Sequence, residues 1–140
     1  MNVAIRYYTR SGNTEKLAKA IAEKLEIAAE TVEKPLEEEV DILFLGCSYY
    51  AFDMDPNVKQ FLQDNKEKIG KIACFGTSAM MKSMAKPMKK VTDSLGISVM
   101  DAEFHCRGSF GPAHKGIPNA ADLKAAQEFA LSLAGKENAK

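Results

Sequence analysis

Tyr8-Thr9-Arg10-Ser11-Gly12-Asn13-Thr14 is the point where an apolar run, Val3 to Tyr8, gives way to an amphipathic run that begins at Thr14. We read this change as a strand, a hydroxyl-rich turn and the start of a helix. A helix start presents unpaired N–H groups and a partial positive charge, so it favours a bound phosphate. Gly12 lets the backbone approach a ligand closely or take a positive φ. The sequence therefore predicts a phosphate-binding loop here.

Polar side chains around the predicted turn support this interpretation. Thr9, Ser11, Asn13 and Thr14 supply further hydrogen-bond donors. No G-x-x-x-x-G-K-[ST] motif occurs, and no G-x-G-x-x-G follows the first strand, so ATP and dinucleotide loops lose their main support. A turn that only caps the helix is the alternative, and it would explain Asn13 and Thr14. It would not explain hydroxyls at both Thr9 and Ser11.

Composition narrows the class of protein. The chain has 140 residues, 46% of them apolar, which suits one domain spanning residues 1–140. The formal charge is zero, so we expect neither a nucleic-acid nor a membrane partner. No targeting segment or transmembrane run is visible, which predicts a cytoplasmic protein. Cysteines and histidines show no metal or triad spacing, so we predict no metal site and no catalytic residue.

Apolar runs that read as strands alternate with helical stripes along the chain. The expected strands are Val3 to Tyr8, Ile27 to Val32, Val40 to Leu45, Ile72 to Phe75 and Ile97 to Cys106. Apolar residues at helical spacing begin after Thr14, after Pro56 and at Met84, and a fourth such segment runs from Asn119 to Ala134. This alternation predicts an α/β fold with a doubly wound parallel sheet. The connection around Pro35 is short for a parallel crossover and reads as a turn or a single helical turn.

The predicted loop also matches a family signature. Thr9-x-Ser11-Gly12-x-Thr14 fits the pattern [T/S]-x-[T/S]-G-x-T, and over essentially its whole length the chain resembles a flavodoxin. The resemblance implies a five-stranded parallel sheet in the order 2-1-3-4-5, for which flavodoxins are the standard example. It also implies one FMN, bound non-covalently at the switch between the first and third strands. The phosphate-binding residues would be Thr9, Arg10, Ser11, Gly12, Asn13 and Thr14.

Two further loops would meet the flavin ring. The first contains Ser48, Tyr49, Tyr50, Ala51 and Phe52, and the second contains Thr77, Ser78 and Ala79. An aromatic side chain commonly stacks on such a flat ring. Tyr49 or Tyr50 would take that position, with Phe52 as third choice, although each could instead pack on the following helix. The second loop would meet the ring edge through its backbone.

The first ring loop departs from the flavodoxin pattern. Ser48 stands where flavodoxins often have proline, and no glycine occurs between Gly46 and Gly70. In many flavodoxins a loop peptide turns over when the flavin is reduced, and glycine makes that turn less costly. A residue with a side chain would take the positive φ that such a turn requires at a cost of roughly 1 kcal/mol or more. We therefore predict that this protein stabilises the one-electron-reduced flavin less than long-established one-electron flavodoxins do.

Three functions remain open from the sequence. The resemblance implies first an electron carrier, a monomer or weak dimer that docks transiently on redox partner proteins. The second is a small FMN-dependent reductase of quinones or similar acceptors that uses NAD(P)H, favoured by the missing loop glycine and the neutral charge. The third is a flavodoxin-like docking module without flavin. The retained polar loop argues against this third function.

Overall fold

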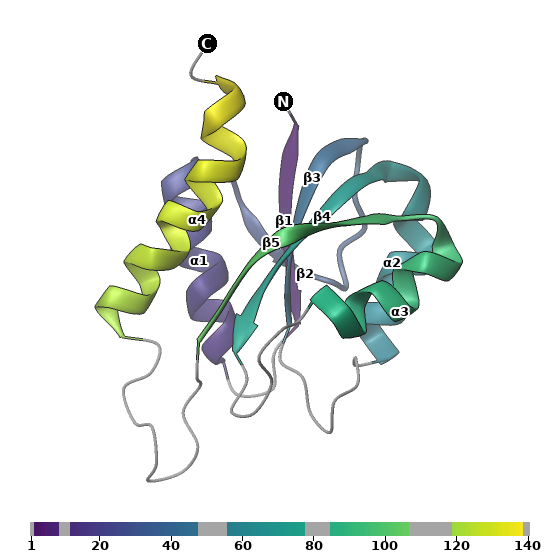
Figure 1. Ribbon diagram of the computed structural model, residues 1–140, viewed down its shortest axis with the longest axis horizontal. Coiled ribbons are helices and arrows are strands. Elements are labelled where there is room, and N and C mark those ends of the chain that lie inside the picture. The colour runs from purple at the N-terminus through teal and green to yellow at the C-terminus, as the bar shows by residue number, and fades with distance from the viewer. Residues whose placement is uncertain (1, 9–11, 48–55, 78–84, 107–118, 139–140) are drawn as a thin grey trace, which may run out of the picture.

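The computed structural model describes residues 2–8, 12–47, 56–77, 85–106 and 119–138 (Figure 1). In this part of the chain, five parallel strands form one sheet in the order β2-β1-β3-β4-β5, which confirms the predicted order. The strands are β1 (Val3–Tyr8), β2 (Ala29–Thr31), β3 (Val40–Cys47), β4 (Ile69–Thr77) and β5 (Ser98–Cys106). The helices are α1 (Asn13–Leu25), α2 (Pro56–Asn65), the 3-10 turn η1 (Lys66–Lys68), α3 (Ala85–Leu95) and α4 (Ala120–Asn138).

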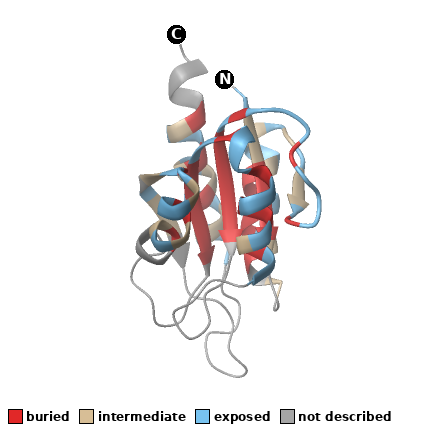
Figure 2. Cartoon of the chain, turned by 90° about the vertical axis from the view of Figure 1, so that its right-hand side faces the viewer, coloured by how far each residue is buried: buried red, intermediate tan, exposed pale blue. Residues whose placement is uncertain are grey.

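Helices cover both faces of the sheet. Figure 1 shows α1 and α4 on one side of the strands and α2 and α3 on the other. Strands β3 and β4 are therefore covered on both faces: Ile42 to Leu45 of β3 and Ile72 to Phe75 of β4 are all buried. Figure 2 shows buried residues, in red, along the strands in the interior of the molecule. No helix in the described part of the chain combines the length and the apolar character that crossing a bilayer requires.

The amphipathic run after the predicted loop forms α1. Leu17, Ala18 and Ile21 are fully buried against the sheet, because their spacing places them on one face of the helix. Glu26 caps the carboxyl end of the helix in a left-handed conformation with φ 58°, and its N–H donates to the carbonyl oxygen of Ala22. A residue with a Cβ pays a steric penalty in that conformation, so this helix end is strained.

The connection from β2 to β3 contains no helix, in line with its predicted shortness. Residues 32–39 pass over β1, which lies between those two strands in the sheet. Val32 and Leu36 are buried in the same core cluster as α2, so they attach the connection to that face of the sheet. Beneath it lies Arg6 of β1, with an exposed fraction of only 7%.

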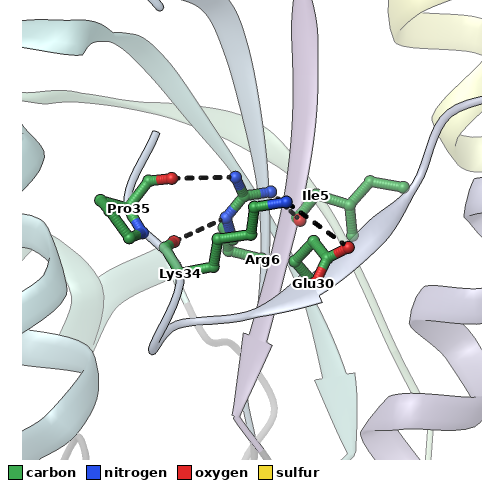
Figure 3. A network of polar contacts seen from close by, with 5 residues as sticks. All are labelled: Ile5, Arg6, Glu30, Lys34 and Pro35. Atoms are coloured by element: carbon green, nitrogen blue, oxygen red, sulfur yellow. Dashed lines mark hydrogen bonds and ion pairs between the residues drawn. The ribbon is translucent and has the colours of Figure 1, made fainter. Parts of the chain in front are cut away.

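Arg6 bonds to the backbone of this connection (Figure 3). Its Nε donates to the carbonyl oxygen of Lys34 at 2.9 Å, and its Nη2 donates to that of Pro35 at 3.2 Å. Nη1 donates to the carbonyl oxygen of Ile5 at 2.9 Å. Burial lowers the pKa of the Arg6 guanidinium, whereas the charges of Glu30 and Glu37 raise it. An arginine nevertheless remains charged in a protein, so Arg6 is a buried cation that binds carbonyl oxygens.

Candidate functional site

The carboxyl ends of the five parallel strands lie at one end of the sheet, the lower end in Figure 1. Tyr8 of β1 pairs with Cys47 of β3, and Thr77 of β4 pairs with Cys106 of β5. From β1 the chain passes through α1 to β2 on one side, while β3 lies on the other side of β1. The order therefore reverses between β1 and β3. Ligands of doubly wound sheets bind outside the carboxyl ends at such a switch point.

The start of α1 lies at this same point. Gly12 occupies the N-cap position with φ 86° and ψ −4°, a left-handed conformation, and its carbonyl oxygen accepts the N–H of Lys16 at 3.3 Å. Among the described residues, none comes within 4 Å of a Cβ built on Gly12. The left-handed backbone conformation is sufficient to explain the glycine.

The first turn of α1 presents backbone N–H groups toward this end of the sheet. Gly12 has no side chain that could accept a hydrogen bond from them, unlike the serine or aspartate that commonly caps a helix. The aligned peptide dipoles give the same end a partial positive charge. Thr14, in this first turn, is completely buried. Such a helix start can hold an anion that brings several acceptor oxygens.

Glu15 brings a negative charge close to this turn, and two neighbours engage it. The Tyr7 hydroxyl donates to Oε2 of Glu15 at 3.3 Å, and Lys19 Nζ lies 3.2 Å from Oε1. Burial raises the pKa of Tyr7, as do the charges of Glu15 and Glu30, so Tyr7 stays a neutral donor at neutral pH. The sequence interpretation did not single out Tyr7 or Glu15. The four-residue spacing of Glu15 and Lys19 was the available signal.

Only part of the predicted site falls within the described residues. Gly12, Asn13 and Thr14 lie in or next to the first turn of α1, and Thr77 ends β4. For Asn13 and Thr77 only the backbone is described. The other predicted site residues lie outside the described part of the chain: Thr9, Arg10, Ser11, Ser48, Tyr49, Tyr50, Ala51, Phe52, Ser78 and Ala79. Their gathering around a ligand therefore stays a prediction.

The described residues offer no metal centre. In that part of the chain no group of three or more His, Cys, Asp or Glu side chains is placed to hold a metal ion. Cys74 is buried within the core cluster under α2 and α3, in keeping with its position in an apolar strand. The site is thus defined by a glycine-capped helix start at the switch point of a parallel sheet.

This combination defines a class of protein, the doubly wound flavodoxin-like folds. The model of a flavodoxin domain matches residues 4–116, and the chain therefore belongs to the flavodoxin family. The match includes the whole turn from Tyr8 to Thr14, all but the first residue of β1, and the whole of β2 to β5.

Individual relatives agree with this assignment. An uncharacterized protein of Methanocaldococcus jannaschii is 30% identical over 135 residues, which cover 86% of this chain and 89% of the relative. The structure of a flavodoxin from the domain Archaea matches with a TM-score of 0.73 at 18% identity, covering 97% of this chain and 98% of the other. A flavoprotein from Lactobacillus acidophilus, solved in complex with FMN, matches with a TM-score of 0.61 at 17% identity, covering 74% of this chain and 91% of the other. At these identities, the two solved structures are evidence for the fold.

Proposed function

We propose that this chain binds one FMN non-covalently and carries electrons between redox partner proteins. The main support for this proposal is the glycine-capped start of α1, which lies at the switch point between β1 and β3 in a chain of the flavodoxin family. The FMN complex of the similarly folded Lactobacillus acidophilus protein supports the choice of cofactor. When bound, FMN supplies reversible uptake of one or two electrons.

The described residues fit the phosphate of FMN. The first turn of α1 offers backbone N–H groups and the positive end of the helix dipole, and Gly12 places no side chain at the N-cap. Thr9, Ser11, Asn13 and Thr14 would add side-chain donors, and Arg10 a positive charge. Tyr49 or Tyr50 would stack on the ring, with Ser48, Ala51 and Phe52 beside it. Thr77, Ser78 and Ala79 would meet the ring edge through their backbone.

Titration of the apoprotein with FMN and, separately, with riboflavin tests the phosphate site. We expect FMN to bind at least 100-fold more tightly, a factor on the order of what two charge-assisted hydrogen bonds provide. Thr14→Val keeps the shape of the side chain but removes its hydroxyl, so it should weaken FMN binding and leave riboflavin binding unchanged. Ser94→Ala is the matched control, since the Ser94 hydroxyl donates to the carbonyl oxygen of Val91 on the exposed surface of α3. Equal affinities for the two flavins would contradict the phosphate site.

A reductase is the second candidate, because the chain has zero formal charge and no glycine between Gly46 and Gly70. Steady-state oxidation of NAD(P)H with a quinone acceptor separates the two functions. A carrier, whether a monomer or a weak dimer in the cytoplasm, should show no turnover until a separate reductase is added. Turnover by the purified protein alone would favour the reductase. A protein that leaves the absorption spectrum of added FMN unperturbed would favour the docking module.

A further inference from the structure

Three buried residues form a cluster directly behind the start of α1. Gly46 of β3 and Phe75 of β4 are register partners in the sheet, and Thr14 belongs to the first turn of α1. All three are buried, with Thr14 and Phe75 completely inaccessible to solvent. We call Thr14, Gly46 and Phe75 the Gly46 cluster.

Glycine at position 46 is required by close approach. A Cβ built there would collide with the ring atoms Cε2 and Cζ of Phe75, and it would lie 3.0 Å from Cγ2 of Thr14. The Phe75 ring therefore occupies the space that a side chain at position 46 would take. This reason differs from that at Gly12, where φ is positive.

The same contact orients Thr14. Its methyl group, Cγ2, is directed toward Gly46. Because the methyl group and the hydroxyl oxygen share one tetrahedral carbon, packing that holds the methyl group also fixes the position of the hydroxyl oxygen Oγ1. The cluster thus sets both the distance of the first turn of α1 from β3 and the position of Oγ1 of Thr14.

We infer that Gly46 and Phe75 are positioning residues for the phosphate of the bound flavin and act through Thr14 and the first turn of α1. This inference rests on the proposed function. Hydrogen bonds to a phosphate depend strongly on distance and angle, so a small displacement of the donors lowers affinity for FMN. Riboflavin lacks the phosphate and should be much less sensitive to that displacement.

Gly46→Ala tests the inference. We expect the ratio of riboflavin to FMN dissociation constants to fall about tenfold, the equivalent of one well-aligned hydrogen bond to a charged group. Gly46→Ala combined with Phe75→Leu should recover much of the ratio, because the smaller side chain leaves room for the new methyl group.

Gly70→Ala is the matched control for a general loss of stability. A Cβ on Gly70, near the amino end of β4, would lie 2.7 Å from the carbonyl oxygen of Asp41 and would also crowd the sheet. It lies at the opposite end of the strand from the Gly46 cluster, so it should lower thermal stability without changing the ratio. An equal fall in the ratio for Gly46→Ala and Gly70→Ala would overturn the inference.

Hydrogen exchange of the apoprotein separates this inference from the proposed function. Gly46→Ala should speed exchange of the backbone amides of Leu17 and Ala18 in α1 more than Gly70→Ala does. A wild-type protein that binds no FMN would refute the proposed function and the ligand part of the inference, while exchange would still decide whether the cluster holds α1. Unchanged exchange in Gly46→Ala, in a protein that does bind FMN, would overturn the inference alone.

Discussion

The chain makes two connections from β1 to β3, and they are stabilised in different ways. From β1 to β2 it passes through α1, a 13-residue helix whose apolar face is buried against the sheet. From β2 to β3 it passes over β1 through residues 32–39, which contain no helix. There, the buried guanidinium of Arg6 donates to the carbonyl oxygens of Lys34 and Pro35.

The difference shows that the connection between parallel strands can be held against the sheet by two kinds of interaction. A helix satisfies its own backbone groups and needs only an apolar stripe to cover the sheet. A short connection leaves backbone carbonyl oxygens without partners in secondary structure, and a buried cation can bind several of them at once. Asn65 assists, since its Oδ1 accepts the N–H of Leu36 at 2.9 Å and its Nδ2 donates to the carbonyl oxygen of Phe61.

The largest expected loss of stability comes from a substitution in the first connection. Ile21 in α1 is completely buried, so Ile21→Ala should lower the free energy of unfolding by about 3 kcal/mol through lost burial and the cavity left behind. Urea unfolding followed by far-ultraviolet circular dichroism measures this change. Lys24→Ala on the exposed side of the same helix is the control and should change stability little. A loss of less than about 1 kcal/mol for Ile21→Ala would mean that apolar packing does not hold α1.

The next largest loss of stability is expected from a substitution that removes the hydrogen bonds to the second connection. Arg6→Met keeps a long unbranched side chain but removes three hydrogen bonds from a buried cation, and we expect a loss of about 2 kcal/mol in the free energy of unfolding. Arg6→Lys keeps the charge without the planar fork, so its loss should be smaller. Unfolding in urea measures both variants. Stability unchanged in Arg6→Met would contradict a net stabilisation of the connection by the hydrogen bonds of Arg6.

The same comparison explains what the sequence could predict of the fold. The existence of the strands and of α1 follows from apolar runs and helical spacing, which are properties of neighbouring residues. The strand order was implied by the resemblance to flavodoxins. Arg6 gave no such signal, since it interrupts an apolar run and its partners are backbone carbonyl oxygens, which nearly every residue offers. Asn65 escaped prediction because its partners, the N–H of Leu36 and the carbonyl oxygen of Phe61, are also backbone groups.

The candidate site divides in a similar way. The positive φ that the sequence predicted as one role of Gly12 is confirmed. It could be predicted because a glycine directly before a helical stripe is a local signal. The requirement for Gly46 could not be predicted, because it depends on the Phe75 ring from another strand and on Thr14 from a helix. A close approach between three elements leaves no periodic pattern in the sequence.

A smaller effect of opposite sign concerns the end of the first connection. Glu26 is exposed and takes a left-handed conformation, so Glu26→Gly should raise the free energy of unfolding by about 0.5 kcal/mol, the relief of strain being partly offset by the greater freedom of glycine in the unfolded chain. Thermal unfolding measures the gain. Lys24→Gly inside the helix is the matched comparison and should be destabilising by about 1 kcal/mol. A loss for Glu26→Gly similar to that of Lys24→Gly would contradict the assignment of strain.

The smallest expected effect sharpens the account of the second connection. Lys34 contributes both its backbone carbonyl, which accepts from Arg6 at 2.9 Å, and its side chain, which lies 3.9 Å from Glu30 on the exposed surface (Figure 3). Lys34→Met removes the ion pair and keeps the carbonyl. Since an exposed pair at this distance contributes little, we expect a change below about 0.5 kcal/mol in urea unfolding, and little further change in high salt. A loss as large as that of Arg6→Met would assign the stability of the connection to the surface ion pair. The expected near-neutral result would leave the buried hydrogen bonds to the backbone as its source.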